Sequence, residues 1–497
     1  MTPLRILVTS MSFRFEVLPN GQLLNHPASI GSALNQFTIW FFDRRFKRQM
    51  PGKRYRYYNK KTNTVYLPRY YLKTFLGFLE TKGVPYRIET LKPPPGADIK
   101  FNMIPGFKPK NSRQRDAIEH LIRSPDAVKG IALQTGVGKS VTTLKHICDV
   151  GKRALIGAQG ITEQWERAIA EWTDLGPDDV YVLKGMPSVT KLLTRIDESL
   201  FPKIILYSIG TLRQYSQDSS SYENYPSFDE LATLLNVGIR VTDESHLNFH
   251  TNFIMDLRLN VASTVVLTAT FDVSDSAVKR IFDSHYPPSI RFGESDYKTY
   301  VKVSAYGYSS ENIPTYAYMG PDGYSHVRLE KWLLFPKQRG RLDWIFRRIY
   351  LPIVQGHYDN IRKPGERCLV LCETVNMCVY LVEKFRREFP NYAVNIYVGE
   401  TDDEILTISD IIVSTTRSSG TARDIKRLRT MLQTTSVSSA PANVQNLGRL
   451  RELDHSDAPE FIYLFNKAIP KQIEYHNTRE GLFRPRSLSF KVIDLAP

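Results

Sequence analysis

The chain has 497 residues, of which 42% are hydrophobic and 11% aromatic, so it is too apolar for a disordered protein and long enough for about three or four domains. Its 66 basic and 51 acidic residues give a formal net charge of +15, which favours a polyanionic partner, nucleic acid before an acidic membrane surface. No apolar run approaches the roughly 20 residues that cross a bilayer, and Arg5 and Arg14 interrupt the N-terminal apolar run. We therefore expect a cytoplasmic protein without a membrane segment, whose four cysteines are core thiols.

The first segment, residues 1–98, is rich in aromatic and basic residues and is predicted to be a small basic α+β domain. It ends at Pro93-Pro94-Pro95-Gly96, which is typical of a stiff linker. Nine of the eighteen residues from 44 to 61 are Lys or Arg and none is acidic, with tyrosines between them. Such a patch suits binding to DNA phosphates, with a solvated basic hairpin face as the alternative. The candidate DNA-binding residues in it are Arg44, Arg45, Lys47, Arg48, Lys53, Arg54 and Arg56.

Two stretches alternate short apolar runs with helical periodicity, which is typical of doubly wound α/β domains with a parallel sheet. They occupy residues 99–285 and residues 345–497. Residues 286–344 differ, because a strand-like alternation is followed by Pro321-Asp322-Gly323, a hairpin-turn signal. We therefore expect a β-rich insertion between two parallel-sheet domains.

A glycine-rich loop, ALQTGVGKS at residues 132–140, lies between a predicted strand and a predicted helix. Gly136 and Gly138 allow backbone amides to close around a phosphate, and the helix directs its N-terminus at the anion. Lys139 would pair with the β- and γ-phosphates, and the Ser140 hydroxyl would join the Mg²⁺ shell. The strict phosphate-loop pattern has a glycine where this chain has Leu133.

A pair of acids follows another apolar strand in VGIRVTDESH. Asp243 can hold Mg²⁺ through water, and Glu244 can orient or deprotonate the attacking water. Taken alone, the pair is equally compatible with a solvated turn at a strand end. The loop and the acids in this order, about a hundred residues apart, predict ATP binding.

Successive motifs in residues 107–470 resemble those of the superfamily-two helicases and translocases. In that family two RecA-like domains flank an ATP site. That family often has the shorter glycine pattern T-G-x-G-K-S, which begins here at Thr135. The resemblance implies an α/β fold with two RecA-like motor domains and the cofactors ATP and Mg²⁺. In the first domain it implies an adenine-reading Gln114, nucleic-acid contacts at Gly160 and Thr211, and coupling residues at His246, Thr268 and Thr270.

In the second domain, IIVSTTRSSGTARDI resembles the fifth helicase motif, which implies a DNA contact at Thr415 and an ATP contact at Asp424. VQNLGRLRE resembles the sixth motif, Q-x-x-G-R-x-x-R, with Gln445 as a coupling residue and Arg449 at the first arginine. The last arginine falls one residue early, at Arg451, and Glu452 stands in its usual place. Either arginine can serve as the arginine finger, and Arg451 is narrowly favoured.

The basic N-terminal domain and the overall layout are similar to the UvsW-like group of phage recombination helicases. This similarity implies action on branched or forked DNA: fork regression, Holliday-junction branch migration and unwinding. A hairpin at residues 316–327 can act as a strand-separating wedge, with Tyr324 stacking on a base, or it can simply pack on its own domain.

We therefore predict an ATP-dependent DNA helicase or translocase, with an RNA helicase as one alternative. The second alternative is a DNA-structure binding protein whose conformation changes when ATP binds but which does not hydrolyse it. This alternative stays open because the motif-six arginine is displaced. The sequence is compatible with a monomer and identifies no protein partner.

Overall fold

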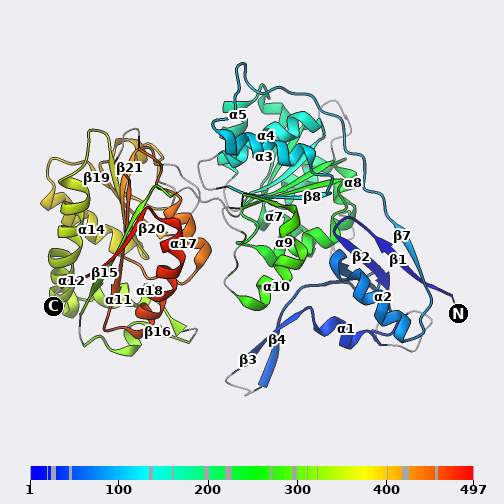
Figure 1. Ribbon diagram of the computed structural model, residues 1–497, viewed down its shortest axis with the longest axis horizontal. Coiled ribbons are helices and arrows are strands. Elements are labelled where there is room, and N and C mark those ends of the chain that lie inside the picture. The colour runs from blue at the N-terminus through cyan, green and yellow to red at the C-terminus, as the bar shows by residue number, and fades with distance from the viewer. Residues whose placement is uncertain are drawn as a thin grey trace. The chain divides into compact units, whose positions relative to one another are not determined.

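The computed structural model describes residues 2–18, 21–23, 29–43, 48–133, 138–158, 162–194, 201–218, 226–268, 271, 273, 275–293, 299–310, 312–321, 323–399, 401–416, 425–453 and 457–495. The chain forms two compact units (Figure 1). The first comprises Met1–Leu133 with Val137–Ser295, and the second comprises Asp296–Pro497.

A small mixed sheet with the strand order β5-β6-β2-β1-β7 begins the first unit. Only β1 and β7 pair in parallel; the other neighbours are antiparallel, and a separate hairpin joins β3 to β4. Its elements are β1 (Leu4–Val8), β2 (Ser12–Glu16), α1 (Gly31–Asn35), β3 (Thr38–Asp43), β4 (Arg48–Arg54), β5 (Tyr57–Asn59), β6 (Thr64–Pro68), α2 (Leu72–Thr81) and β7 (Tyr86–Thr90). The α+β character predicted for this segment is confirmed.

The rest of the first unit is built on a seven-stranded parallel sheet in the order β10-β11-β9-β12-β13-β8-β14. Its strands are β8 (Val128–Ala132), β9 (Ala154–Ala158), β10 (Val180–Leu183), β11 (Ile204–Ser208), β12 (Ile239–Thr242), β13 (Ser263–Thr268) and β14 (Arg291–Phe292). Its helices are α3 (Ser112–Arg123), α4 (Lys139–Val150), α5 (Glu163–Trp172), α6 (Gly185–Leu193), α7 (Ile209–Asp218), α8 (Leu231–Leu234), α9 (Phe249–Arg258) and α10 (Ser276–His285).

The second unit is built on another seven-stranded parallel sheet, in the order β19-β20-β18-β21-β22-β15-β23. Its strands are β15 (Lys302–Tyr308), β18 (Arg367–Cys372), β19 (Val394–Tyr397), β20 (Ile411–Thr415), β21 (Leu428–Gln433), β22 (Glu460–Asn466) and β23 (Ser489–Asp494), and β16 (Met319–Gly320) pairs with β17 (Gly323–Tyr324) in a small hairpin. Its helices are α11 (His326–Leu333), α12 (Arg339–Ile345), α13 (Leu351–Val354), α14 (Val375–Glu388), α15 (Ile405–Ile408), α17 (Ala440–Leu447) and α18 (Pro470–Phe483).

Helices cover both faces of each parallel sheet, which explains why the strands are apolar along their whole length (Figure 1). On the first sheet, one core contains residues of α3, α4 and α5, and the opposite core contains residues of α7, α8 and α9. On the second sheet, α12 and α14 contribute to one core and α17 and α18 to the other. The prediction of two doubly wound parallel-sheet domains is confirmed.

The predicted insertion is partly a component of the second sheet. Residues 302–308 form β15, which pairs in parallel with β22 over seven residues and with β23 on its other side. The second unit therefore begins near Asp296 instead of at residue 345. The sequence missed this pairing because β15 meets β22 only after more than 150 residues of chain, and strand alternation carries no information about such distant partners.

The N-terminal sheet shares a hydrophobic core with the first parallel sheet, so it is not an independently tethered module. Tyr55 is buried and stacks on Phe249 with a ring separation of 5.5 Å. The Arg258 guanidinium lies 4.1 Å from the centre of the Tyr57 ring. These tyrosines, predicted to support nucleic-acid binding, instead contribute to this packing.

The proline-rich segment is fixed to the edge of the first parallel sheet where the strands begin. The Ala97 N–H donates to the Asn236 carbonyl at 2.8 Å, and Arg153 N–H donates to the Ala97 carbonyl at 2.9 Å. Gly96 has a φ of +74°, and a Cβ there would lie 2.4 Å from the Cα of Gly238. Two glycines therefore allow this close backbone crossing, and the predicted linker acts as a strap.

Two expectations about the chain's chemistry can be compared with the structure. All four cysteines are free thiols, and Cys368, Cys372 and Cys378 are buried. Within the described part of the chain, no helix combines the length and the apolar character needed to cross a bilayer.

His146 predicts a pH-dependent contribution to stability. It is buried in α4, its ring nitrogens have no hydrogen-bond partner among the described residues, and burial lowers its pKa to about 4. The ordinary pKa of histidine is near 6.5, so between pH 6.5 and 4 the side chain is protonated in the unfolded chain but neutral in the folded chain. The free energy of unfolding therefore falls as the pH falls toward 4.

For His146→Leu we expect the loss of stability below pH 6.5 to become shallower by up to about 1.4 kcal/mol per pH unit. At pH 7 the variant should be about 1 kcal/mol more stable, because two unsatisfied buried polar atoms are removed. Urea unfolding at a series of pH values measures both effects. Identical pH profiles for the variant and the wild type would contradict the assignment.

Candidate nucleotide site

The glycine-rich loop ends at the start of α4. Residues 134–137, including the predicted ligands Thr135 and Gly136, lie outside the described part of the chain. Gly138 has a φ of +96°, a backbone conformation that residues other than glycine rarely adopt. Helix α4 begins directly after it, at Lys139. Lys139 and Ser140 therefore occupy the first turn of α4, where the helix dipole and unpaired N–H groups favour an anion.

Gln114, the predicted adenine-reading residue, lies beside this turn. It is buried in α3, accepts a hydrogen bond from the Lys110 N–H at 2.7 Å, and donates to the Gly138 carbonyl at 3.4 Å. A Cβ on residue 138 would lie 2.4 Å from the Gln114 amide nitrogen. The glycine therefore serves both the turn and the close approach of α3.

Lys139 and Glu244 form an ion pair and hydrogen bond between Nζ and Oε1. Their side chains are only 11% and 16% exposed, so the pair is mostly shielded from solvent. Glu244 adopts a left-handed φ of +45°, which is unfavourable for a residue with a side chain. Strained backbone of this kind concentrates at functional sites, where surrounding contacts hold it in place.

Asp243 is held by hydrogen bonds to both of its carboxylate oxygens. The Trp165 indole N–H donates to Oδ2 at 3.1 Å, and the Glu244 backbone N–H donates to Oδ1 at 3.0 Å. Burial raises the pKa of the Asp243 carboxyl, and nearby Lys139 opposes this shift. An ionised carboxylate has about four acceptor positions, so both hydrogen bonds leave capacity for a cation.

Sequence reasoning missed Trp165. This residue is fully buried in α5, which follows β9, and β9 and β12 are neighbours in the sheet. Trp165 lies five residues after Gly160, and the strand order brings its indole to Asp243. The signal that would have identified it is a tryptophan in the segment that follows β9, because β9 is the neighbour of β12, the strand that precedes the acids.

His246 and Thr268, each predicted to be a coupling residue, contact one another. His246 Nδ1 and Thr268 Oγ1 are 2.6 Å apart, and burial lowers the pKa of His246 to about 4. The neutral imidazole therefore links the turn after β12 to the end of β13. The predicted Thr270 lies outside the described residues.

Of the two predicted nucleic-acid contacts of the first parallel-sheet domain, the structure describes only Thr211. Gly160 lies outside the described residues. Thr211 is buried in the first turn of α7, where its hydroxyl accepts from Gly185 N–H at 3.3 Å and lies 2.9 Å from Ser208 Oγ. Its hydroxyl thus helps to hold the turn at the end of β11.

In the second unit the described predicted residues lie at the end of β20, on α17 and just after α17. Thr415 is the buried last residue of β20, and Asp424 lies outside the described residues. Gln445 is half-buried on α17, Arg449 is buried just after that helix, and Arg451 is half-buried. Arg451 donates to the Gly448 carbonyl, which folds its guanidinium back on the turn.

The predicted basic patch is described only in part, since Arg44, Arg45 and Lys47 lie outside the described residues. Arg48, Lys53 and Arg54 are exposed on β4, as a phosphate-binding strand requires. Arg56 is half-buried, and burial lowers the pKa of its guanidinium.

Tyr324, predicted to stack on a base, is tied to its own unit. Its hydroxyl accepts from Gln472 at 2.7 Å and lies 2.7 Å from His326 Nδ1. Tyr318 is buried, so Tyr316 is the exposed tyrosine of this hairpin region, at 68%.

No cluster of three or more His, Cys, Asp or Glu side chains suited to a metal occurs among the described residues. The site brings together Lys139, Asp243, Glu244, His246 and Thr268, all at the edge of the first parallel sheet where its strands end. A lysine on a helix N-terminus beside two carboxylates is equipped to bind a phosphate group with its cation.

No protein-family model and no curated protein matches the sequence. Solved structures do match. S. cerevisiae Dbp5 bound to RNA and ADP BeF3 is similar with a TM-score of 0.50 and 11% identity, covering 77% of this chain and 89% of that chain. The ATP-dependent Type ISP restriction-modification enzyme LlaBIII bound to DNA is similar with a TM-score of 0.53 and 14% identity, covering 78% of this chain and 32% of that chain. The likeness, at these identities, establishes the fold: two RecA-like units.

Gly138 provides a test of the turn before α4. For Gly138→Ala we expect a loss of about 1–2 kcal/mol in the free energy of unfolding, because the residue must keep a positive φ and its Cβ would collide with Gln114. Gly77→Ala, in the exposed face of α2 with nothing within 4 Å, is the matched control. It should gain about 0.5–1 kcal/mol through helix propensity. Equal effects of the two substitutions would contradict the strained turn.

Proposed function

We propose that this chain is an ATP-hydrolysing motor of the superfamily-two helicase type that remodels branched DNA. The observation that carries the proposal is the convergence of Lys139, Asp243 and Glu244 at one edge of a RecA-like sheet. The order and spacing of the surrounding motifs, from Gln114 to Arg451, support the same assignment.

The residues present fit a Mg–ATP complex. Asp243 and the Ser140 hydroxyl are oxygen ligands of the kind that Mg²⁺ prefers, and they would hold the ion beside the phosphates. When bound, Mg²⁺ neutralises the charge that develops on the transferring phosphoryl group. Lys139 would contact the β- and γ-phosphates from the first turn of α4.

The ion pair between Lys139 and Glu244 gives these residues a second role. A γ-phosphate competes with Glu244 for the lysine, because both are anions within reach of the same Nζ. Binding of the nucleotide would therefore release the Glu244 carboxylate, which then orients or deprotonates the attacking water. In this proposal Lys139 would pair with either the catalytic base or the phosphate.

A nucleic-acid substrate is supported by the net charge of +15 and by the exposed β4 residues Arg48, Lys53 and Arg54. DNA is preferred because the N-terminal domain is similar to that of the UvsW-like phage helicases, which also supports branched DNA and a phage origin. RNA is the second candidate, since Dbp5, whose fold this chain shares, was solved with RNA bound.

The decisive test is steady-state ATP hydrolysis without polymer and with linear duplex, single-stranded DNA, a DNA fork or RNA. We expect strong stimulation by the fork, loss of turnover in Lys139→Ala, and a decrease of at least about a hundredfold in Glu244→Gln. Lys145→Ala is the matched control, because Lys145 lies on the same helix but pairs with Asp149. Stimulation by RNA alone would identify RNA, instead of DNA, as the substrate. Unchanged turnover in Lys139→Ala would refute the assignment of the nucleotide site.

The two motif-six arginines make separable predictions. Arg451 is the more accessible, so we expect Arg451→Ala to lower kcat by about a thousandfold while the KM for ATP changes little. Arg449 is buried, so Arg449→Ala should instead lower the melting temperature. Full kcat in Arg451→Ala, with loss in Arg449→Ala at a temperature where it remains folded, would move the finger to Arg449.

A further inference from the structure

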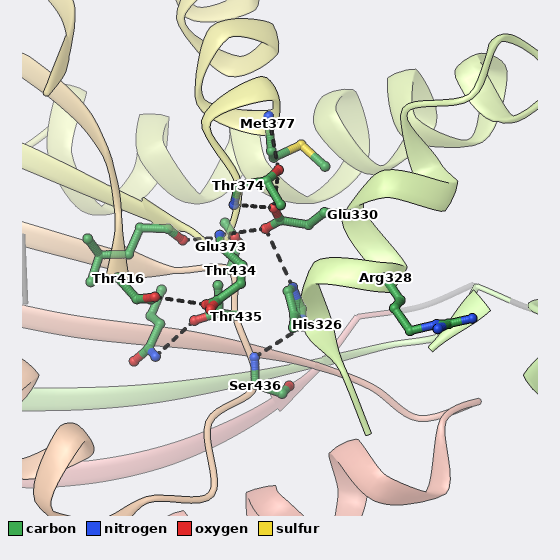
Figure 2. Close-up of polar contacts among 12 residues, drawn as sticks. His326, Arg328, Glu330, Glu373, Thr374, Met377, Thr416, Thr434, Thr435 and Ser436 are labelled. Carbon is green, nitrogen blue, oxygen red and sulfur yellow. Dashed lines mark hydrogen bonds and ion pairs between the residues drawn. The ribbon is translucent and has the colours of Figure 1, made fainter. Parts of the chain in front are cut away.

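Helix α11 has an inner face that is locked into the second unit by a buried carboxylate. Glu330 is 2% exposed and accepts hydrogen bonds from Glu373 N–H at 2.8 Å and Thr374 N–H at 2.7 Å (Figure 2). The Thr374 hydroxyl donates to it as well, at 2.7 Å. These donors lie directly after β18, so Glu330 joins α11 to the start of α14.

The same network extends to the loops after two other strands. Thr416, after β20, donates its hydroxyl to Glu373 at 2.8 Å, and Ser436 N–H, after β21, donates to His326 Nδ1 at 3.4 Å (Figure 2). His326 and Glu330 are four residues apart and therefore lie on one face of α11. The helix is thus anchored at the carboxyl edge of a parallel sheet, where ligands of such sheets bind.

The opposite side of α11 carries side chains that point away from this network. Arg328 points away from His326 and Glu330 (Figure 2), Lys331 follows three residues later on the same helix, and Phe335 lies just beyond the helix end at Leu333. All three side chains are exposed, Phe335 by 60%. Arg328 also contacts the preceding loop, where its Nη2 lies 3.5 Å from the Tyr316 carbonyl.

The segment that contains α11 is predominantly basic. Residues 323–350 contain seven Lys or Arg residues and two acids. One acid is the buried Glu330, and the other, Asp343, pairs with Lys384 at 2.6 Å and accepts from the Tyr380 hydroxyl at 2.6 Å. The segment therefore carries an excess of basic side chains, and the exposed aromatic residues Tyr316 and Phe335 lie before it and within it.

We propose that Tyr316, Arg328, Lys331 and Phe335, here called the Tyr316 surface, bind an unpaired nucleic-acid strand on the second unit. Exposed aromatic rings among cations are the combination that binds single strands, since every base has a face for stacking and every nucleotide a phosphate. Tyr318 and Tyr324 are packed inward and contribute no ring to this surface. The inference rests on the proposed function and specifies where one strand is held.

The test measures fluorescence anisotropy of labelled oligodeoxythymidylate with the full chain at a series of salt concentrations. Tyr316→Leu should weaken binding by about tenfold, and Tyr316→Phe should retain it, because stacking needs the ring and not the hydroxyl. The double variant Arg328→Ala/Lys331→Ala should make the salt dependence shallower by about 1.4 in log–log slope, as two lost phosphate contacts predict. All these side chains are exposed, so the variants should fold.

Arg387→Ala is the matched control, because Arg387 is an exposed arginine of α14 that lies outside the Tyr316 surface. It should leave affinity and slope unchanged. Wild-type affinity in both Tyr316→Leu and the double variant would overturn the inference, and would leave a protein as the occupant of this surface. If the wild type neither binds the oligonucleotide nor responds to any polymer in ATP hydrolysis, the proposed function itself fails.

Discussion

Parallel strand pairing is the constraint on which the candidate site depends. Each strand of a parallel sheet ends at the same edge, so segments far apart in the chain meet there. Lys139 follows β8, Trp165 follows β9, Asp243 follows β12, and Thr268 ends β13. The pairing of β9 with β12 and of β12 with β13 is what brings an indole, two carboxylates and an imidazole within hydrogen-bonding reach.

The ion pair between Lys139 and Glu244 explains how such an edge tolerates so much buried polarity. A shielded lysine and a shielded glutamate are each costly alone, but together they satisfy one another. The backbone of Glu244 is held in a left-handed conformation, so the turn stores strain at the position where a base would act. Trp165 and the Glu244 N–H fix the neighbouring Asp243, which separates an oriented acid from a movable one.

Local patterns predicted those parts of the fold that depend on local chemistry. Apolar runs predicted the strands of both parallel sheets, and Gly138 predicted the start of α4. The acids after β12 predicted the position of the candidate site. Features that depend on distant pairing were not visible: β15 completes the second sheet through β22, and Trp165 reaches Asp243 only through strand order. Hydrophobic periodicity reports which face of a strand is buried, but not which strand lies beside it.

The aromatic residues illustrate the same limit and its functional consequence. Tyrosines near cations were predicted to support phosphate binding at residues 44–61 and base stacking at Tyr324, yet Tyr55 stacks on Phe249 and Tyr324 is hydrogen-bonded to Gln472. A tyrosine near basic residues can therefore have either of two roles. A buried ring stabilises the fold, and an exposed ring is accessible to a ligand. Tyr316 is exposed, and its carbonyl lies 3.5 Å from Arg328 on α11, the helix that Glu330 joins to the sheet edge.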